Sequence, residues 1–307
     1  AIMQNHAVSL SGGTAKSNYY ASLSAMVDPG WYKQSSVNRY TANFNLNHRI
    51  LDNLSVTILA NASYRKQKAP GTSGQDVDVV SGNVKRDFDI NPYSYALNSS
   101  RALDPNEYYQ LNYAPFNILH ELESNYIDLN VVNTKFQMQL AYNPIKDLEL
   151  AVLGAFKYDA TSTEHNILDD SNQALAYRAM QTLSVRDNNR YLYTDPDITY
   201  ALPVSVLPQG GFYKRTDNRM VSYDFRATAN YKHTCADAHI LNVFGAFEFA
   251  GSDRTKSYFN GVGMQYAKGE VPFWVYQFFK KSSEENTDYY SLSNRHFRRA
   301  AFIGKLT

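Results

Sequence analysis

The sequence Asn53–Arg65, NLSVTILANASYR, alternates apolar and polar residues with a period of two, with Leu59 as the only exception. Leu54 and Val56 fall on one side of this alternation, and Ser55 and Thr57 fall on the other. Because successive side chains of a β-strand point to opposite sides, the stretch predicts a strand with one apolar and one wet face. No stretch has a comparably regular helical period, so we expect an all-β chain. The other stretches with the clearest alternation are 37–50, 128–143 and 220–232.

The expected strands are long, and the connections between them alternate between short and long. Soluble sheets usually have strands of ~5–6 residues, whereas a tilted strand that crosses a membrane needs ~9–11. Membrane barrels of the up-and-down type place short turns on one side and long loops on the other. This pattern therefore predicts an antiparallel up-and-down transmembrane β-barrel. The nine predicted strands are 5–12, 16–27, 37–50, 53–66, 127–143, 147–160, 219–234, 237–251 and 294–307. The long connections are Asp28–Ser36, Gln67–Tyr126, Thr161–Asn218 and Ser252–Ser293.

The two faces of these strands predict two surroundings. In a membrane barrel the apolar face meets lipid, the polar face lines a wet interior, and all backbone groups pair strand to strand. A soluble β-sandwich, in which the apolar faces of two sheets pack together, is the alternative reading. The polar residues expected to face the lumen are Arg39, Asn43, Asn45, Lys135, Gln137, Arg226 and Asn230.

Composition excludes several other classes of protein. The 307 residues carry 30 Lys and Arg against 29 Asp and Glu, a net charge of +1, which argues against nucleic-acid binding through a basic surface. The single cysteine, placed in an expected short turn at Cys235, leaves no disulfide framework and no CxxC site. No run of ~18 apolar residues predicts a transmembrane helix.

Catalytic and metal motifs are weak. His120-Glu121-Leu122-Glu123 lacks the second histidine of an HExxH zinc site. The carboxylate pairs Asp169–Asp170 and Glu284–Glu285 read best as solvated loop charges, and a calcium site remains the alternative. We therefore expect no enzyme activity, no cofactor and no metal.

Specific residues add a family resemblance. The segment His6–Leu23, HAVSLSGGTAKSNYYASL, resembles the first hairpin of SusC/RagA-type TonB-dependent outer-membrane transporters. Asn38–Leu46, Val243–Glu248 and Arg298–Thr307 are similar to later strands of that family, in the same order. The resemblance implies a 22-stranded barrel enclosing a plug domain. Residues 1–307 would then be about nine strands of one barrel domain, with the plug and the other strands absent.

The same resemblance implies a function. Such a protein would import oligosaccharides or peptides across the outer membrane of a Gram-negative bacterium. It would work with a SusD-like surface lipoprotein and be driven by the TonB complex through the plug. Two alternatives stay open from the residues alone: a soluble or surface-attached β-sandwich that binds glycans, and a complete small barrel that serves as an adhesin or structural protein.

Aromatic residues in the long loops are the candidates for binding cargo. Loops on a rigid scaffold commonly carry recognition residues, and aromatic rings stack on sugars or on peptide side chains. The alternative for each ring is packing of the loops against themselves or against a partner protein. The candidates are Trp31, Tyr32, Tyr93, Tyr193, Trp274 and Tyr276.

Overall fold

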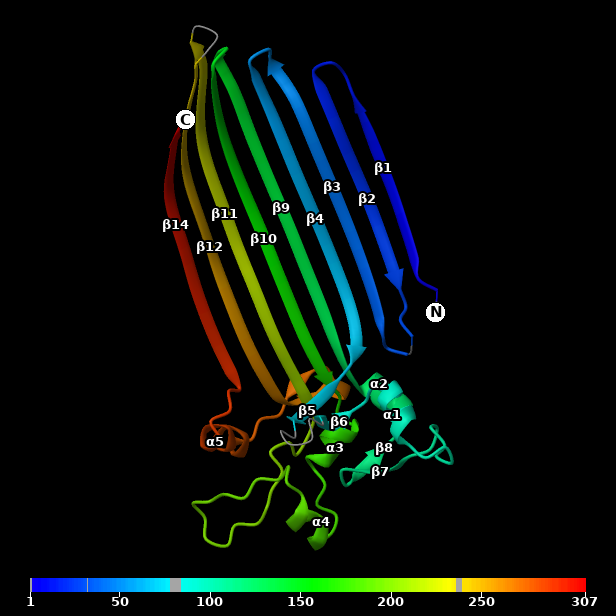
Figure 1. The fold of residues 1–307 in the computed structure, drawn as a ribbon. Coiled ribbons are helices and arrows are strands. Elements are labelled where there is room, and N and C mark those ends of the chain that lie inside the picture. The colour runs from blue at the N-terminus through cyan, green and yellow to red at the C-terminus, as the bar shows by residue number, and fades with distance from the viewer. Residues whose placement is uncertain (1, 32, 78–83, 236–238) are drawn as a thin grey trace.

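The computed structural model of the protein describes residues 2–31, 33–77, 84–235 and 239–307. One antiparallel sheet dominates it, and its nine long strands lie side by side in chain order (Figure 1). This confirms the expected all-β, up-and-down arrangement. The long strands are β1 (Gln4–Gly13), β2 (Ser17–Asp28), β3 (Ser36–Leu51), β4 (Leu54–Pro70), β9 (Asn125–Ile145), β10 (Leu148–Ile167), β11 (Gly211–Cys235), β12 (His239–Gln265) and β14 (Tyr290–Leu306).

Several strands extend further into the long loops than the sequence predicted. β10 runs to Ile167 rather than to 160, β11 begins at Gly211 rather than at 219, and β12 ends at Gln265 rather than at 251. The apolar alternation stops in these extensions, but the backbone ladder continues; Lys214 pairs with Asn260, for example. The expectation that Cys235 lies in a turn was also wrong, because it closes β11 opposite His239. Residues 237–238 of the expected strand 237–251 lie outside the described residues.

The long connections contain short elements that the sequence reading missed. Helices of five to nine residues are too short to show a clear apolar period, and they are marked mainly by capping residues. Asn117, for example, accepts backbone N–H groups of Leu119 and His120 and so starts α2. The helices are α1 (Pro92–Asn98), α2 (Ile118–Ser124), α3 (Asn172–Ala176), α4 (Leu183–Asn188), α5 (Tyr276–Glu284) and the 3-10 turn η1 (Tyr266–Lys268). The short strands are β5 (Thr72–Val77), β6 (Val84–Asp89), β7 (Tyr109–Leu111), β8 (Ala114–Phe116) and β13 (Val271–Pro272).

The strand register builds one continuous apolar face. Phe44 is paired with Ala60, which is paired with Phe136, and Phe136 with Phe156 on β10. Within the described residues no second sheet covers this face, and Phe136 and Phe156 remain 45% and 47% exposed. A soluble sandwich would bury such rings, so this arrangement argues against that alternative.

The sheet is open in the described part of the chain. β1 pairs only with β2 and β14 only with β12, so the two edge strands do not meet. The structure therefore supports the many-stranded antiparallel sheet of the expected barrel, and the closure of that sheet into a barrel stays a prediction. No helix in the described residues has the length and apolarity to cross a membrane.

The buried core lies at the long-loop end of the sheet, in the lower part of Figure 1. One cluster joins Ile167 and Phe212 on the strand extensions to Ala174 and Leu207 in the loop between them. A second cluster joins Phe88 before α1 to Tyr191 and Ala176. The described parts of the loops therefore form a packed layer on the end of the sheet, which we call the loop layer (residues 67–77, 84–126, 161–218 and 252–293).

Candidate recognition surface in the loop layer

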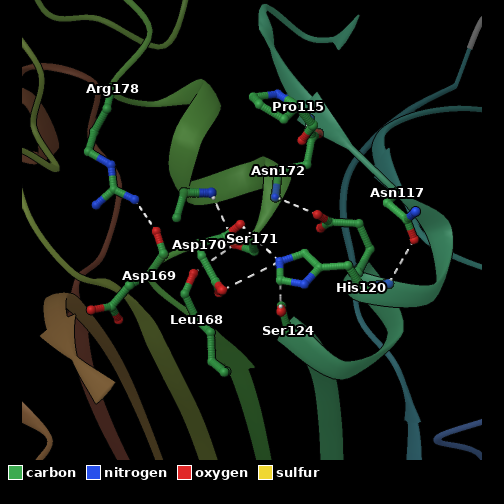
Figure 2. Close-up of polar contacts among 12 residues, drawn as sticks. Pro115, Asn117, His120, Ser124, Leu168, Asp169, Asp170, Ser171, Asn172 and Arg178 are labelled. Carbon is green, nitrogen blue, oxygen red and sulfur yellow. Dashed lines mark hydrogen bonds and ion pairs between the residues drawn. The ribbon is translucent and has the colours of Figure 1, made fainter. Parts of the chain in front are cut away.

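The junction between α2 and α3 ties two long loops together (Figure 2). Glu121 on α2 is 1% exposed, and its Oε1 accepts the backbone N–H of Asn172 at 2.7 Å. The side-chain amide of Asn172 lies 2.8, 3.1 and 3.2 Å from the carbonyl oxygens of Leu111, Ala114 and Pro115. One asparagine thus joins α3 to the β7–β8 hairpin, while its own backbone is held by α2.

The carboxyl of Glu121 sits in an environment that disfavours its charge. Burial raises the pKa of Glu121 to about 8, the hydrogen bond from Asn172 lowers it, and the charge of Asp170 raises it. Its Oε2 has no hydrogen-bond partner among the described residues. Glu121 is therefore mostly protonated at neutral pH, which removes the cost of an uncompensated buried charge.

His120 takes part in the same junction. Its Nε2 lies 3.2 Å from the backbone oxygen of Asp170 and 3.5 Å from the carboxylate of that residue (Figure 2). The hydroxyl of Ser124 lies 3.2 Å from the same nitrogen. The backbone oxygen of Ser124 accepts the N–H of Leu168 at 2.8 Å. His120 thus helps to hold the second long loop against the third through its contacts with Asp170.

A second set of contacts ties the loop after β10 to the loop after β12. Arg178 donates to the carbonyl oxygens of Gly210, at 2.9 Å, and of Asp169. The carboxylate of Asp169 accepts the backbone N–H of Tyr266 at 3.1 Å, and the Tyr266 hydroxyl donates to the carbonyl of Phe212 at 2.9 Å. The carboxylates of Asp169 and Asp170 thus hold different neighbours.

A group of three acids lies between the third and fourth long loops. Ligand oxygens of Asp195, Asp197 and Glu284 lie within 4.8 Å of one another. The ammonium of Lys280 already sits among them, in contact with Asp195, 2.6 Å from Asp197 and 3.9 Å from Glu284. The hydrogen bond from Lys280 lowers the pKa of Asp195. A lysine thus supplies the positive charge here, and the group works as an ion-pair clamp between the loops.

The six aromatic candidates fall in different surroundings. Tyr193 is only 5% exposed, and its hydroxyl donates to Glu284 at 2.8 and 3.0 Å, so it packs the loops together. Trp31 is 94% exposed in the turn between β2 and β3, near the opposite edge of the sheet from α5 (Figure 1). Tyr32 lies outside the described residues. The remaining exposed candidates are Tyr93, Trp274 and Tyr276.

Trp274 borders an apolar hollow in the fourth long loop. This hollow has a volume of about 240 Å³ and lies between α5 and the end of β12. Trp274 meets Phe279 edge to face, with ring centroids 6.4 Å apart. The size and lining suit one apolar side chain or a similar group. Its other lining residues include Phe259, Val275, Phe278 and Tyr289.

The seven polar strand residues share the face opposite the apolar one, as the register shows. Asn43 donates to Ser22 at 3.1 Å and accepts from Asn61 at 2.8 Å, so it belongs to a ladder of polar side chains across β2, β3 and β4. Arg226 pairs with Glu248 at 2.7 Å on the same face of β11 and β12. That this face lines a lumen stays a prediction. The others on it are Arg39, Asn45, Lys135, Gln137 and Asn230.

Comparisons with known proteins add one observation. No protein-family model and no curated protein matches the sequence. Among solved structures, the chain is similar to the RagAB peptide importer in its closed-closed state, with a TM-score of 0.64, 14% identity, and coverage of 98% of this chain and 29% of that one. The open-open state gives a TM-score of 0.63 at 15% identity, again over 98% and 29%. The likeness is one of fold.

A further structure, of the RagAB peptide transporter, gives a TM-score of 0.61 at 15% identity and covers 99% of this chain. The chain spans about 30% of the length of that chain. The likeness in fold therefore extends over nearly the whole of this chain and over less than a third of the other.

Sequence reasoning missed the residues that hold the loop layer together. Glu121 was considered only as part of an incomplete zinc motif, although Asn117 four positions earlier is a helix N-cap signal. Asn172 follows Ser171, which caps α3, and that cap could have located the helix. Lys280 and Glu284 are four residues apart on α5, but Asp195 and Asp197 come from another long loop, and nothing in the sequence brings these two to Lys280.

Proposed function

We propose that this chain forms part of the barrel wall of an outer-membrane nutrient importer of the SusC/RagA type. The observation that carries the proposal is the continuous two-faced antiparallel sheet, whose long loops gather at one end and which superposes on RagAB chains over nearly its whole length. The apolar face would meet lipid and the polar face would line the path of the cargo. The loop layer would face outward and carry recognition.

The complete protein would act with partners that the family resemblance implies. A SusD-like lipoprotein would cover the outer mouth, and the TonB complex would act through a plug that is not part of these 307 residues. The protein would sit in the outer membrane of a Gram-negative bacterium. No catalytic step is assigned to this chain; its role is to bind and pass cargo.

Peptides are the cargo class that we favour over oligosaccharides. The solved structures named above are described as a peptide importer or transporter. The hollow beside Trp274 is lined by Phe and Val side chains, and these suit an apolar amino-acid side chain better than a sugar ring that needs directional hydrogen bonds.

Uptake in the native organism tests the proposal. Deletion of the gene should abolish energy-dependent accumulation of a labelled peptide mixture, and reintroduction of the complete gene should restore it. Labelled oligosaccharides, assayed in parallel, separate the two cargo classes. Normal uptake of both cargo types in the deletion strain would refute the proposed transport function.

A further inference from the structure

The apolar face of β10 and β11 ends at a definite row of side chains, whereas on β12 the charged Asp253 already lies on this face, opposite Val221. On the side of the short turns, Tyr158 is paired with Val221. One row nearer the long loops, Ala160 is paired with Arg219, and Arg219 with Thr255. The apolar band of β10 therefore runs from Leu148 to Tyr158, about the ~9–11 residues that a tilted strand needs to cross a bilayer.

A hollow lies just beyond this boundary, on the same face of the sheet; its lining is largely apolar, with a few polar side chains at its edge. Its volume is about 410 Å³. Small side chains form its floor, among them Ala160 and Ser162 on β10. Thr255 and Ser257 on β12 contribute hydroxyl groups. The oxygen of Ser162 is buried and has no hydrogen-bond partner among the described residues.

The two arginines beside the hollow differ in what they bind. Arg215 is held by Glu164 at 3.3 Å and by Asp217 at 2.7 Å, so its charge is neutralised within the protein. Arg219 is exposed, and in the part of the chain that the structure describes its guanidinium makes no hydrogen bond or ion pair. Arg219 therefore presents an unpaired positive charge to the hollow.

An unpaired guanidinium beside hydroxyl donors is suited to an anionic oxygen group. Arginine binds phosphate through two parallel N–H bonds, and serine and threonine hydroxyls can bind the remaining oxygens. Tyr158, at the apolar side of the hollow, is a residue type that gathers at the level where headgroups begin. The site thus combines one free guanidinium, hydroxyl donors and the depth at which a phosphorylated headgroup lies, while the carboxylate of Asp217, which also lines the hollow, is held by Arg215.

We infer that the hollow at Arg219 binds the phosphorylated headgroup of a membrane lipid, with the acyl chains lying along the apolar band. This inference rests on the proposed function, because it requires the apolar face to meet lipid. The opposite, polar face supplies a matched control. Arg254 on β12 is also an exposed arginine without an ion pair among the described residues. It is the chain neighbour of Thr255, but its side chain lies on the polar face of the sheet, away from the hollow.

The test uses the full-length protein in detergent micelles. Dihexanoyl phosphatidylglycerol is titrated by calorimetry into the wild type, Arg219→Gln and Arg254→Gln. Dihexanoylglycerol, which has no phosphate, and inorganic phosphate are titrated in parallel. We expect Arg219→Gln to weaken binding of the phospholipid about tenfold. We expect Arg254→Gln to bind the phospholipid with the affinity of the wild type. Dihexanoylglycerol should bind the wild type only as weakly as the phospholipid binds Arg219→Gln.

Three results would overturn the inference. The first is equal affinity in the wild type and Arg219→Gln, and the second is an equal loss in both variants. The third is binding of inorganic phosphate as tight as that of the phospholipid, which would make the hollow a free-anion site. Flotation with lipid vesicles distinguishes failure of the headgroup inference from failure of the proposed function. If the wild type does not float with the vesicles, both are refuted. If it floats but Arg219→Gln leaves the affinity for the phospholipid unchanged, only the headgroup site is refuted.

Discussion

The buried carboxyl of Glu121 makes the loop layer sensitive to pH, and Glu121→Gln should remove that sensitivity. The glutamine has nearly the shape of the protonated carboxyl, and its oxygen can still accept the backbone N–H of Asn172. Because it carries no charge at any pH, the variant fixes the state that the wild type reaches only by taking up a proton.

The size of this pH effect on loop packing follows from the pKa of Glu121. Its value is raised from 4.5 to about 8, mainly by burial. Ionisation in the packed loops is therefore less favourable than in the opened loops by on the order of 5 kcal/mol. Between pH 4.5 and 8 the Glu121 carboxyl is protonated in the packed loops and ionised in the opened loops. The free energy needed to open the loops therefore falls as pH rises through that window. Below pH 4.5 both states are protonated, and the penalty is absent.

Hydrogen exchange is the assay that reports this local opening. The backbone amide of Asn172 should exchange faster as pH rises from 5 to 8.5, after correction for the intrinsic pH dependence of exchange. In Glu121→Gln the corrected protection should stay nearly constant and exceed that of the wild type at pH 8.5. The exposed Glu123 on the same helix provides the control, since Glu123→Gln should keep the wild-type profile. The reasoning is refuted if Glu121→Gln and the wild type show the same corrected pH profile.

Four further predictions concern other parts of the structure. Asn172→Ala should destabilise the loop layer by about 2–3 kcal/mol, because three backbone carbonyls lose their donor, and limited proteolysis of the loops would measure it. Trp274→Ala should weaken cargo binding in the full-length protein without loss of barrel assembly, and unchanged affinity would remove Trp274 from the site. Trp31→Ala should do the same if the first loop also contacts cargo. Phe136→Arg, on the apolar face, should impair assembly by about 2–4 kcal/mol in a membrane, whereas Gln137→Arg on the polar face should be tolerated, as heat-modified gel mobility would report.

The long strands were predictable because their physical signal is local and repeated. A strand with one wet and one apolar face shows its alternation along its whole length, and Leu54 to Tyr64 follows it at every position except Leu59. The strand extensions were not predictable in this way. Around Lys214 and Asn260 both faces meet protein or water instead of one uniform apolar surrounding, so the alternation ends while the hydrogen-bonded ladder continues.

The loop layer was hardly predictable, because its contacts join residues that are far apart in sequence. Glu121 meets Asn172 and Tyr193 meets Glu284 only after several loops have folded together. Tyr193 shows the consequence. An aromatic residue in a long loop suits cargo binding and loop packing equally well by sequence, and only its burial and its bond to Glu284 decide for packing.

The central claim is that the sheet is a wall with one wet face and one face in lipid, and cysteine labelling along β9 tests it most directly. Single cysteines at Lys135, Phe136, Gln137 and Met138 would be introduced into the full-length protein carrying Cys235→Ser. Isolated outer membranes would then be treated with a small water-soluble thiol reagent. The account predicts that Lys135→Cys and Gln137→Cys are labelled and that Phe136→Cys and Met138→Cys are labelled only after detergent extraction. Equal labelling at all four positions in intact membranes would contradict it.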